Sequence, residues 1–167
     1  MFMGHLGVAL GAKGTRRDVS LLLLCIAAVL PDLIDFALEG AGHADGAGLW
    51  THSLTAMLIY AVAFFAAYAL MTHRYVAALI VGMVAASHVL LDLITSRVTL
   101  WRNGPVAGFH LYAHKDWDVL LEMAVIVAGW YVYGRSLKPE RRWSVALWTI
   151  LVVLLAMESV TLVVNFS

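Results

Sequence analysis

The chain has 167 residues, of which 62% are hydrophobic and only 13% are charged, and its eleven basic and eleven acidic side chains cancel. Soluble domains average about 45–50% apolar and 25% charged residues, so this composition excludes an ordinary soluble globule and indicates an integral membrane protein. The balanced charge argues against a nucleic-acid partner. Because no repeat or linker divides the chain, residues 1–167 are expected to form a single membrane-embedded domain.

Five apolar segments approach the roughly 20 residues that a membrane-spanning helix needs. They are Val19–Leu38, Ser53–Met71, Tyr75–Thr95, Trp117–Gly134 and Trp143–Val163. A further segment, Met1–Ala12, is apolar but only half as long, and is expected to form a short helix on or partly in the membrane. The predicted fold is therefore an all-α polytopic bundle of about five transmembrane helices with a short N-terminal helix.

The lysine and arginine residues predict the orientation of this bundle, because cytoplasmic loops are enriched in them. With the N-terminus in the cytoplasm, eight of the eleven basic residues lie on the cytoplasmic side and three on the other. The histidines and acids within or beside the spans then gather in the outer half of the membrane. This distribution predicts one site that opens toward the outer leaflet of a bacterial inner membrane.

Two acids follow a proline in the first span. Asp32 and Asp35 lie about one helical turn apart, and Pro31 should kink the helix and free a carbonyl beside them. Asp32 is a candidate metal ligand, and Asp35 is a candidate general base or a member of a second metal site. The alternative is a kinked helix end whose acids face lipid headgroups.

Two histidines belong to the second and third spans. His88 and Asp92 are four residues apart, so they share a helix face and can reach the same cation. His52 opens the second span, with Thr51 or Ser53 as a possible helix cap. The alternatives are a polar pair that only joins helices, and an interfacial histidine. Ionisable groups inside a membrane are costly, which favours a functional site.

The remaining candidates lie near the fourth span and at the start of the chain. His114, Asp118 and Glu122 follow at four-residue steps and would share one face of a helix that starts near His114. They are candidates for a second metal site, with Glu122 a possible general base, although acids are also common where a helix starts. A residue count leaves His5, another candidate ligand, about 10 Å short of the depth of Asp32.

Imidazoles and carboxylates without thiolates suit zinc, and also manganese or iron. The candidates outnumber the ligands of one tetrahedral zinc, which makes a second metal plausible. A metal lowers the pKa of its bound water to about 7, and a second metal would stabilise the charge of an in-line displacement at phosphorus. Tyr112, Arg97 and Arg102 are candidates for contacting an anionic headgroup, or for interfacial anchoring.

Several short motifs occur in an order that resembles the bacterial membrane-bound metal-dependent hydrolases, a family of inner-membrane proteins. The motifs are Gly4-His5-Leu6, Leu30-Pro31-Asp32, Thr51-His52-Ser53-Leu54, Ser87-His88-Val89-Leu90-Leu91-Asp92 and Gly108-Phe109-His110-Leu111-Tyr112, followed by Glu122. They cover the chain to about residue 135. The resemblance implies a metal-dependent hydrolase in the inner membrane.

The same order is distantly similar to that of the zinc-dependent phospholipases C, helical proteins with a three-zinc site. That likeness implies a set of metal ligands with Asp92 bridging: His5, Asp32, His52, His88 and Asp92. It also implies a later histidine–acid pair, matched here by His114 and Asp118.

The expected function is hydrolysis of a phosphoester of a lipid or other amphiphile that enters from the bilayer. Two alternatives remain: a protein that binds or transports metal ions without hydrolysis, and a scaffold whose site has lost its activity. A transporter would need polar groups at both depths of the membrane.

Overall fold

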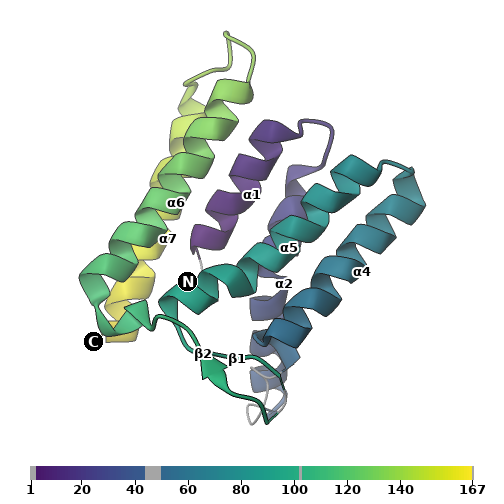
Figure 1. The fold of residues 1–167 in the computed structure, drawn as a ribbon. Coiled ribbons are helices and arrows are strands. Elements are labelled where there is room, and N and C mark those ends of the chain that lie inside the picture. Colours follow the sequence, from purple (N-terminus) through teal and green to yellow (C-terminus); the bar gives the residue numbers. More distant parts are fainter. Residues whose placement is uncertain (1–2, 44–49, 102, 167) are drawn as a thin grey trace.

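Helices dominate the computed structural model, which describes residues 3–43, 50–101 and 103–166, with the side chains of 161–166 left out. The helices are α1 Met3–Thr15, α2 Leu21–Gly40, α4 Leu54–Thr72, α5 Tyr75–Thr95, α6 Lys115–Ser136 and α7 Val145–Phe166 (Figure 1). The predicted all-α bundle is confirmed. Within the described ranges the only strands are two of two residues each.

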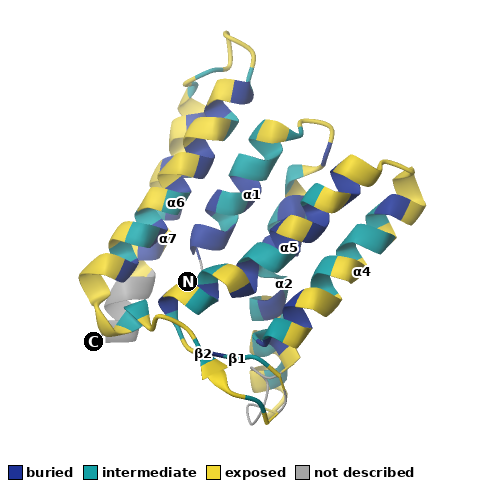
Figure 2. Ribbon diagram, viewed as in Figure 1, coloured by how far each residue is buried: buried dark blue, intermediate teal, exposed yellow. Residues whose placement is uncertain are grey.

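Four of these helices, α2, α4, α5 and α6, are long and apolar enough to cross a membrane. The fifth predicted span coincides with α7, whose described side chains form a shorter apolar stretch, Val145–Val160. The outward faces carry large exposed apolar side chains, such as Leu58 and Val62 on α4 and Val152 on α7 (Figure 2). In water such faces would be costly, whereas in a bilayer they contact lipid chains.

The predicted short N-terminal helix is present, and α1 lies among the spanning helices (Figure 1). On one side Ala9 packs in an apolar cluster with residues of α2 and α5, including Leu24 and Val81. On the other side Leu10 packs in a second cluster with residues of α6 and α7, including Ile126. Helix α1 therefore joins two halves of the bundle, and its side chains belong to the core.

The contact between α1 and α6 depends on glycines. A Cβ atom added to Gly129 would lie 1.8 Å from the carbonyl oxygen of Gly7, and one added to Gly7 would lie 2.7 Å from the carbonyl oxygen of Val125. Small residues of this kind let two helix backbones approach closely in a membrane, where packing replaces the hydrophobic effect as the driving force. The glycines thus fix how deeply α1 sits beside α6.

Between α5 and α6 the chain forms a hairpin of β1 Val98–Thr99 and β2 Val106–Ala107, followed by the 3-10 helix η1 Leu111–Ala113. The hairpin lies at the end of the bundle where α1 begins (Figure 1). It is held against α5 by the Phe109 amide, which donates to the carbonyl of Leu93 at 2.8 Å. Sequence analysis did not predict the strands, because two residues carry no periodicity.

At the opposite end, the turn between α1 and α2 carries charged groups on the surface. The Arg16 guanidinium donates to both carboxylate oxygens of Asp18 at 2.9 and 2.8 Å. This pairing lowers the pKa of Asp18 to about 2. The charges at this end are therefore exposed or paired on the surface, whereas the other end buries ionisable groups.

Candidate metal centre

Five imidazole and carboxylate side chains converge at the end of the bundle beside the hairpin. They come from α1, α2, the turn before α4, and α5: His5, Asp32, His52, His88 and Asp92. They form two groups of three with the spacing of metal ligands, and His88 belongs to both. We call Asp32, His52 and His88 the half-buried triad, and His5, His88 and Asp92 the buried triad.

In the half-buried triad, three ligand atoms face one another. The Nε2 atom of His52 lies 3.1 Å from Asp32 Oδ1 and 3.1 Å from His88 Nε2. The distance from His88 Nε2 to Asp32 Oδ1 is 3.5 Å. His52 and Asp32 retain 24% and 17% of their side-chain exposure, while that of His88 is zero, so this triad is open on one side.

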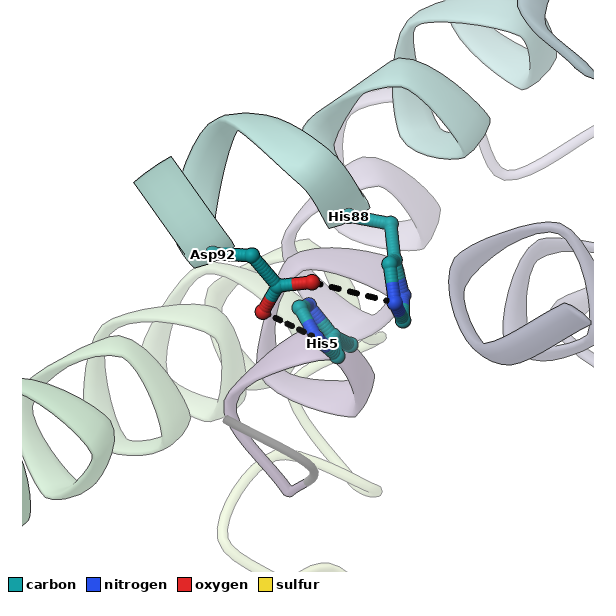
Figure 3. Close-up of side chains that lie close together, drawn as sticks. All are labelled: His5, His88 and Asp92. Carbon is teal, nitrogen blue, oxygen red and sulfur yellow. Dashed lines mark ion pairs between the residues drawn. The ribbon is translucent and has the colours of Figure 1, made fainter. Parts of the chain in front are cut away.

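In the buried triad, the carboxylate of Asp92 points one oxygen toward each of two imidazoles (Figure 3). Its Oδ2 is 3.3 Å from His88 Nε2, and its Oδ1 is 3.6 Å from His5 Nε2. The rings of His5 and His88 stack with their centroids 3.9 Å apart. Asp92 Oδ2 also lies 3.7 Å from His52 Nε2, so this carboxylate contacts histidines of both triads.

These separations fit a shared cation. Ligand atoms 2.0–2.1 Å from a tetrahedral zinc lie roughly 3.3 Å from one another, which is the range found among the five side chains. Three neutral imidazoles and two carboxylates would also balance the charge of a divalent ion, and an unbalanced pair of carboxylates would be costly inside a membrane protein. Their chemistry therefore fits zinc, manganese or iron.

The hydrogen bonds behind the triads orient the two central histidines. His88 Nδ1 lies 2.7 Å from the carbonyl oxygen of Ala28, and His52 Nδ1 lies 3.0 Å from Asp35 Oδ2. A carbonyl or carboxylate oxygen only accepts, so each Nδ1 carries the proton. In the neutral form of both rings, the two Nε2 atoms then direct lone pairs toward each other at 3.1 Å, an arrangement that a cation between them stabilises.

A second polar contact fixes Asp35 itself. The hydroxyl of Thr51, a fully buried residue, donates to Asp35 Oδ1 at 2.6 Å, and Thr51 Oγ1 is 2.8 Å from His52 Nδ1. Thr51 or Ser53 was predicted to cap α4, and the cap is Ser53, which accepts from the amide of Ala56 at 3.1 Å. Thr51 thus supports the half-buried triad.

The half-buried triad opens into a polar pocket of about 270 Å³. Asp32, His52 and Asp92 line it together with Asp35, and its other walls are Phe36, Glu39, Ser96 and Tyr112. Tyr112, predicted to contact a headgroup, is therefore beside the site. Arg97 is exposed and does not line this pocket, and Arg102 lies outside the described residues.

The structure brings His5 to the centre despite the depth expected from the residue count, which was wrong by about 10 Å. Helix α1 ends at Thr15 and α2 begins at Leu21, so His5 and Asp32 lie ten and eleven residues from the connecting turn. At about 1.5 Å per residue those distances are nearly equal. The count had not anticipated that the helix continues past Ala12.

The candidates near α6 belong to neither triad. His114 precedes α6 and is exposed, while Asp118 is 2% exposed and its Oδ1 lacks a hydrogen-bond partner among the described residues. Neither belongs to a group with metal-ligand spacing. Glu122 is buried, and its Oε2 accepts a hydrogen bond from the amide of Gly4 at 3.2 Å. A metal-binding role for these three residues stays a prediction.

Two supporting groups were missed in sequence analysis. The carbonyl of Ala28 has no side-chain signature, and it is not the carbonyl that Pro31 leaves without a helical partner, which belongs to Ala27, four residues before the proline. The role of Thr51 was missed because only the folded chain brings it to Asp35, sixteen residues earlier. The dipeptide Thr51-His52 was the one available signal, since a hydroxyl next to a histidine can contact its ring.

The chain matches the YdjM inner membrane protein family over residues 1–164 and belongs to it. That family is described as membrane-bound metal-dependent hydrolases, which agrees with the resemblance found in the motifs. It also identifies the chain as an integral inner-membrane protein. Comparison with the curated proteins and with the solved structures yields no match. The more distant likeness to phospholipases C stays a prediction.

Proposed function

We propose that this member of the YdjM family is a metal-dependent hydrolase that cleaves a phosphoester of a lipid or other amphiphile. The observation that carries the proposal is the pair of Nε2 atoms of His52 and His88, which face each other at 3.1 Å with both Nδ1 atoms bonded elsewhere. Two carboxylates approach the same point. This arrangement supports a divalent cation as the catalytic group of the site.

Asp32, His52, His88, Asp92 and His5 would hold the metal. When bound, such a metal would generate a nucleophile from water near neutral pH and stabilise the negative charge on the phosphoryl oxygens. Asp35 keeps the His52 ring in position and lines the polar pocket, where its carboxylate is placed to accept a proton from water. Hydrolysis would then add water across the phosphorus–oxygen bond and release an alcohol and a phosphate group.

An apolar groove supports an amphiphilic substrate. It encloses about 580 Å³ between α1, α5 and α6, and Ser87 and Leu90, on either side of His88 in the sequence, contribute to its wall. Along α5 it extends from Ile80 to Leu90, a length of about 15 Å. One acyl or isoprenoid chain would match the length of this groove. We propose that the phosphoester of the same molecule binds in the polar pocket, which is lined by residues of the same helix, α5.

The distribution of buried ionisable residues favours a hydrolase over a transporter. Among the described residues, those with almost no exposure are His5, His88, Asp92, Asp118, Glu122 and Glu158. The charged residues of the turn between α1 and α2, such as Arg16 and Asp18, form exposed pairs instead. A route across the membrane would need polar groups at both depths. We further propose that the site faces the outer leaflet, with the N-terminus in the cytoplasm.

The test begins with the metal content of the purified protein, comparing wild type with Asp92→Ala and with Glu140→Gln, an exposed acid far along the chain from the site. We expect zinc, manganese or iron in wild type and Glu140→Gln and little in Asp92→Ala. Equal, negligible metal in all three would refute the proposal.

The second step offers phospholipids and isoprenoid phosphates of different chain lengths in mixed micelles. We expect release of a phosphate group that depends on the added metal and on a long apolar chain. Vesicles that take up radioactive zinc or manganese without any phosphoester turnover would instead identify a transporter.

A further inference from the structure

His5 is the one histidine of the metal centre whose ring is not oriented by a hydrogen bond at Nδ1. Both of its ring nitrogens lack a hydrogen-bond partner among the described residues, although the side chain is fully buried. The distance of 3.6 Å from His5 Nε2 to Asp92 Oδ1 is beyond normal hydrogen-bond length. The position of this imidazole therefore depends on its stacking with His88 and on the backbone of α1.

The backbone of α1 is held next to His5 by a residue of α6. The amide of Gly4 lies in the first turn of α1, where helix amides have no partner within the helix. It donates to Glu122 Oε2 at 3.2 Å, and the two residues are separated by 118 positions in the sequence. A carboxylate also interacts favourably with the positive end of a helix dipole. Glu122 thus ties the start of α1 to α6.

A second buried acid lies near this contact. The carboxyl groups of Glu122 on α6 and Glu158 on α7 are neighbours, and both residues are nearly inaccessible, at 3% and 2% exposure. Two buried acids from α6 and α7 therefore lie beside the first turn of α1, whose Gly4 precedes a candidate ligand in the sequence.

We propose that Glu122 is a positioning residue for the metal centre: through the amide of Gly4 it sets the place of His5 in the buried triad. This inference rests on the proposed metal site. It differs from the prediction that Glu122 binds a second metal or acts as a general base, since here it acts on the metal only through His5. Outer groups of this kind usually change metal affinity by about 10–100-fold.

A double-mutant cycle with zinc alone as the probe tests the proposal. Zinc affinity is measured by competition with a chelator for wild type, Glu122→Ala, His5→Ala and the double variant. We expect Glu122→Ala to weaken binding by about 10-fold or more, and to have no further effect once His5 is absent. Glu122→Gln, whose amide oxygen still accepts from Gly4, should recover part of the affinity. The control Glu140→Gln should match wild type.

Two outcomes of the cycle would overturn the proposal. If Glu122→Ala weakens binding equally with and without His5, Glu122 acts on the metal directly. If zinc affinity is unchanged while hydrolysis is lost, Glu122 acts in the chemistry. Should Glu122→Ala fail to fold, Glu122→Gln, alone and combined with His5→Ala, completes the same cycle with a smaller expected loss.

Amide hydrogen exchange, measured without metal, tests the contact separately from the proposed function. In Glu122→Ala the amides of residues 3–7 should exchange faster than in wild type, while those of α4 should not change. Unchanged exchange in residues 3–7 would refute the contact between Glu122 and α1. If wild type binds neither zinc nor manganese nor iron, the proposed function fails, and the exchange result alone still decides whether Glu122 holds the start of α1.

Discussion

The half-buried and buried triads share His88 but are held in different ways. In the half-buried triad, His52 is oriented by Asp35 and Thr51 and faces a polar pocket. In the buried triad, none of the residues that the structure describes orients His5 in this way, and its place follows from how α1 packs against α6. One half of the centre is therefore built by local polar contacts, and the other by helix packing, so they should respond to different substitutions.

The largest effect is expected where the two triads meet. His88→Ala removes the nitrogen that both share, and we expect zinc affinity to fall by more than about 100-fold, beyond the usual effect of an outer group. The measurement is zinc content after dialysis against a weak chelator. Retention of zinc at the wild-type level would show that the triads do not form one centre.

A smaller loss of zinc affinity is expected from a substitution that affects only the half-buried triad. Asp35→Ala removes the acceptor of His52 Nδ1 and of the Thr51 hydroxyl, and should weaken zinc binding by about 10–100-fold. Asp35→Asn keeps an acceptor oxygen and should lose less. Competition titrations of the two variants measure the difference, and identical losses would mean that the negative charge of Asp35 matters more than its contact with His52.

The smallest effect on zinc affinity is expected from a substitution that disturbs the packing of α1 against α6. In Gly129→Ala the new methyl group would meet the carbonyl of Gly7 at 1.8 Å, so α1 must move, at a cost of about 1–3 kcal/mol in the free energy of unfolding. The matched control is Gly11→Ala, whose methyl group would lie 3.6 Å from Gly129, an ordinary contact. Thermal unfolding in detergent, with and without zinc, measures both.

If the buried triad depends on packing, Gly129→Ala should also lower zinc affinity by a few-fold while Gly11→Ala should not. Loss of stability without any change in zinc affinity would show that His5 finds its place regardless of how α1 packs.

The contrast between the triads also explains what the sequence could predict. The spacing of His88 and Asp92 places both on one helix face, and the structure keeps them 3.3 Å apart. His114 and Asp118 have the same spacing, yet His114 precedes α6 and is exposed. The spacing of two residues predicts whether they share a helix face, but it does not predict which other helices that face contacts.

The supporting contacts were beyond prediction for a related reason. The carbonyl of Ala28 meets His88 across 60 positions of the chain, and Gly4 meets Glu122 across 118. Backbone groups look alike at every position in the sequence, so only the packed helices single them out. The spans themselves were predicted well, because their length and hydropathy are local properties.

The place of α1 beside α6 has a consequence for how the protein is made. Chains are synthesised from the N-terminal side, so His5 leaves the ribosome before Glu122 and Gly129, which hold its helix and follow more than a hundred residues later. Helix α1 therefore waits for α6 before its position is fixed. Until α6 is inserted, the nascent protein holds the half-buried triad alone, and the centre is completed only when α6 packs against α1.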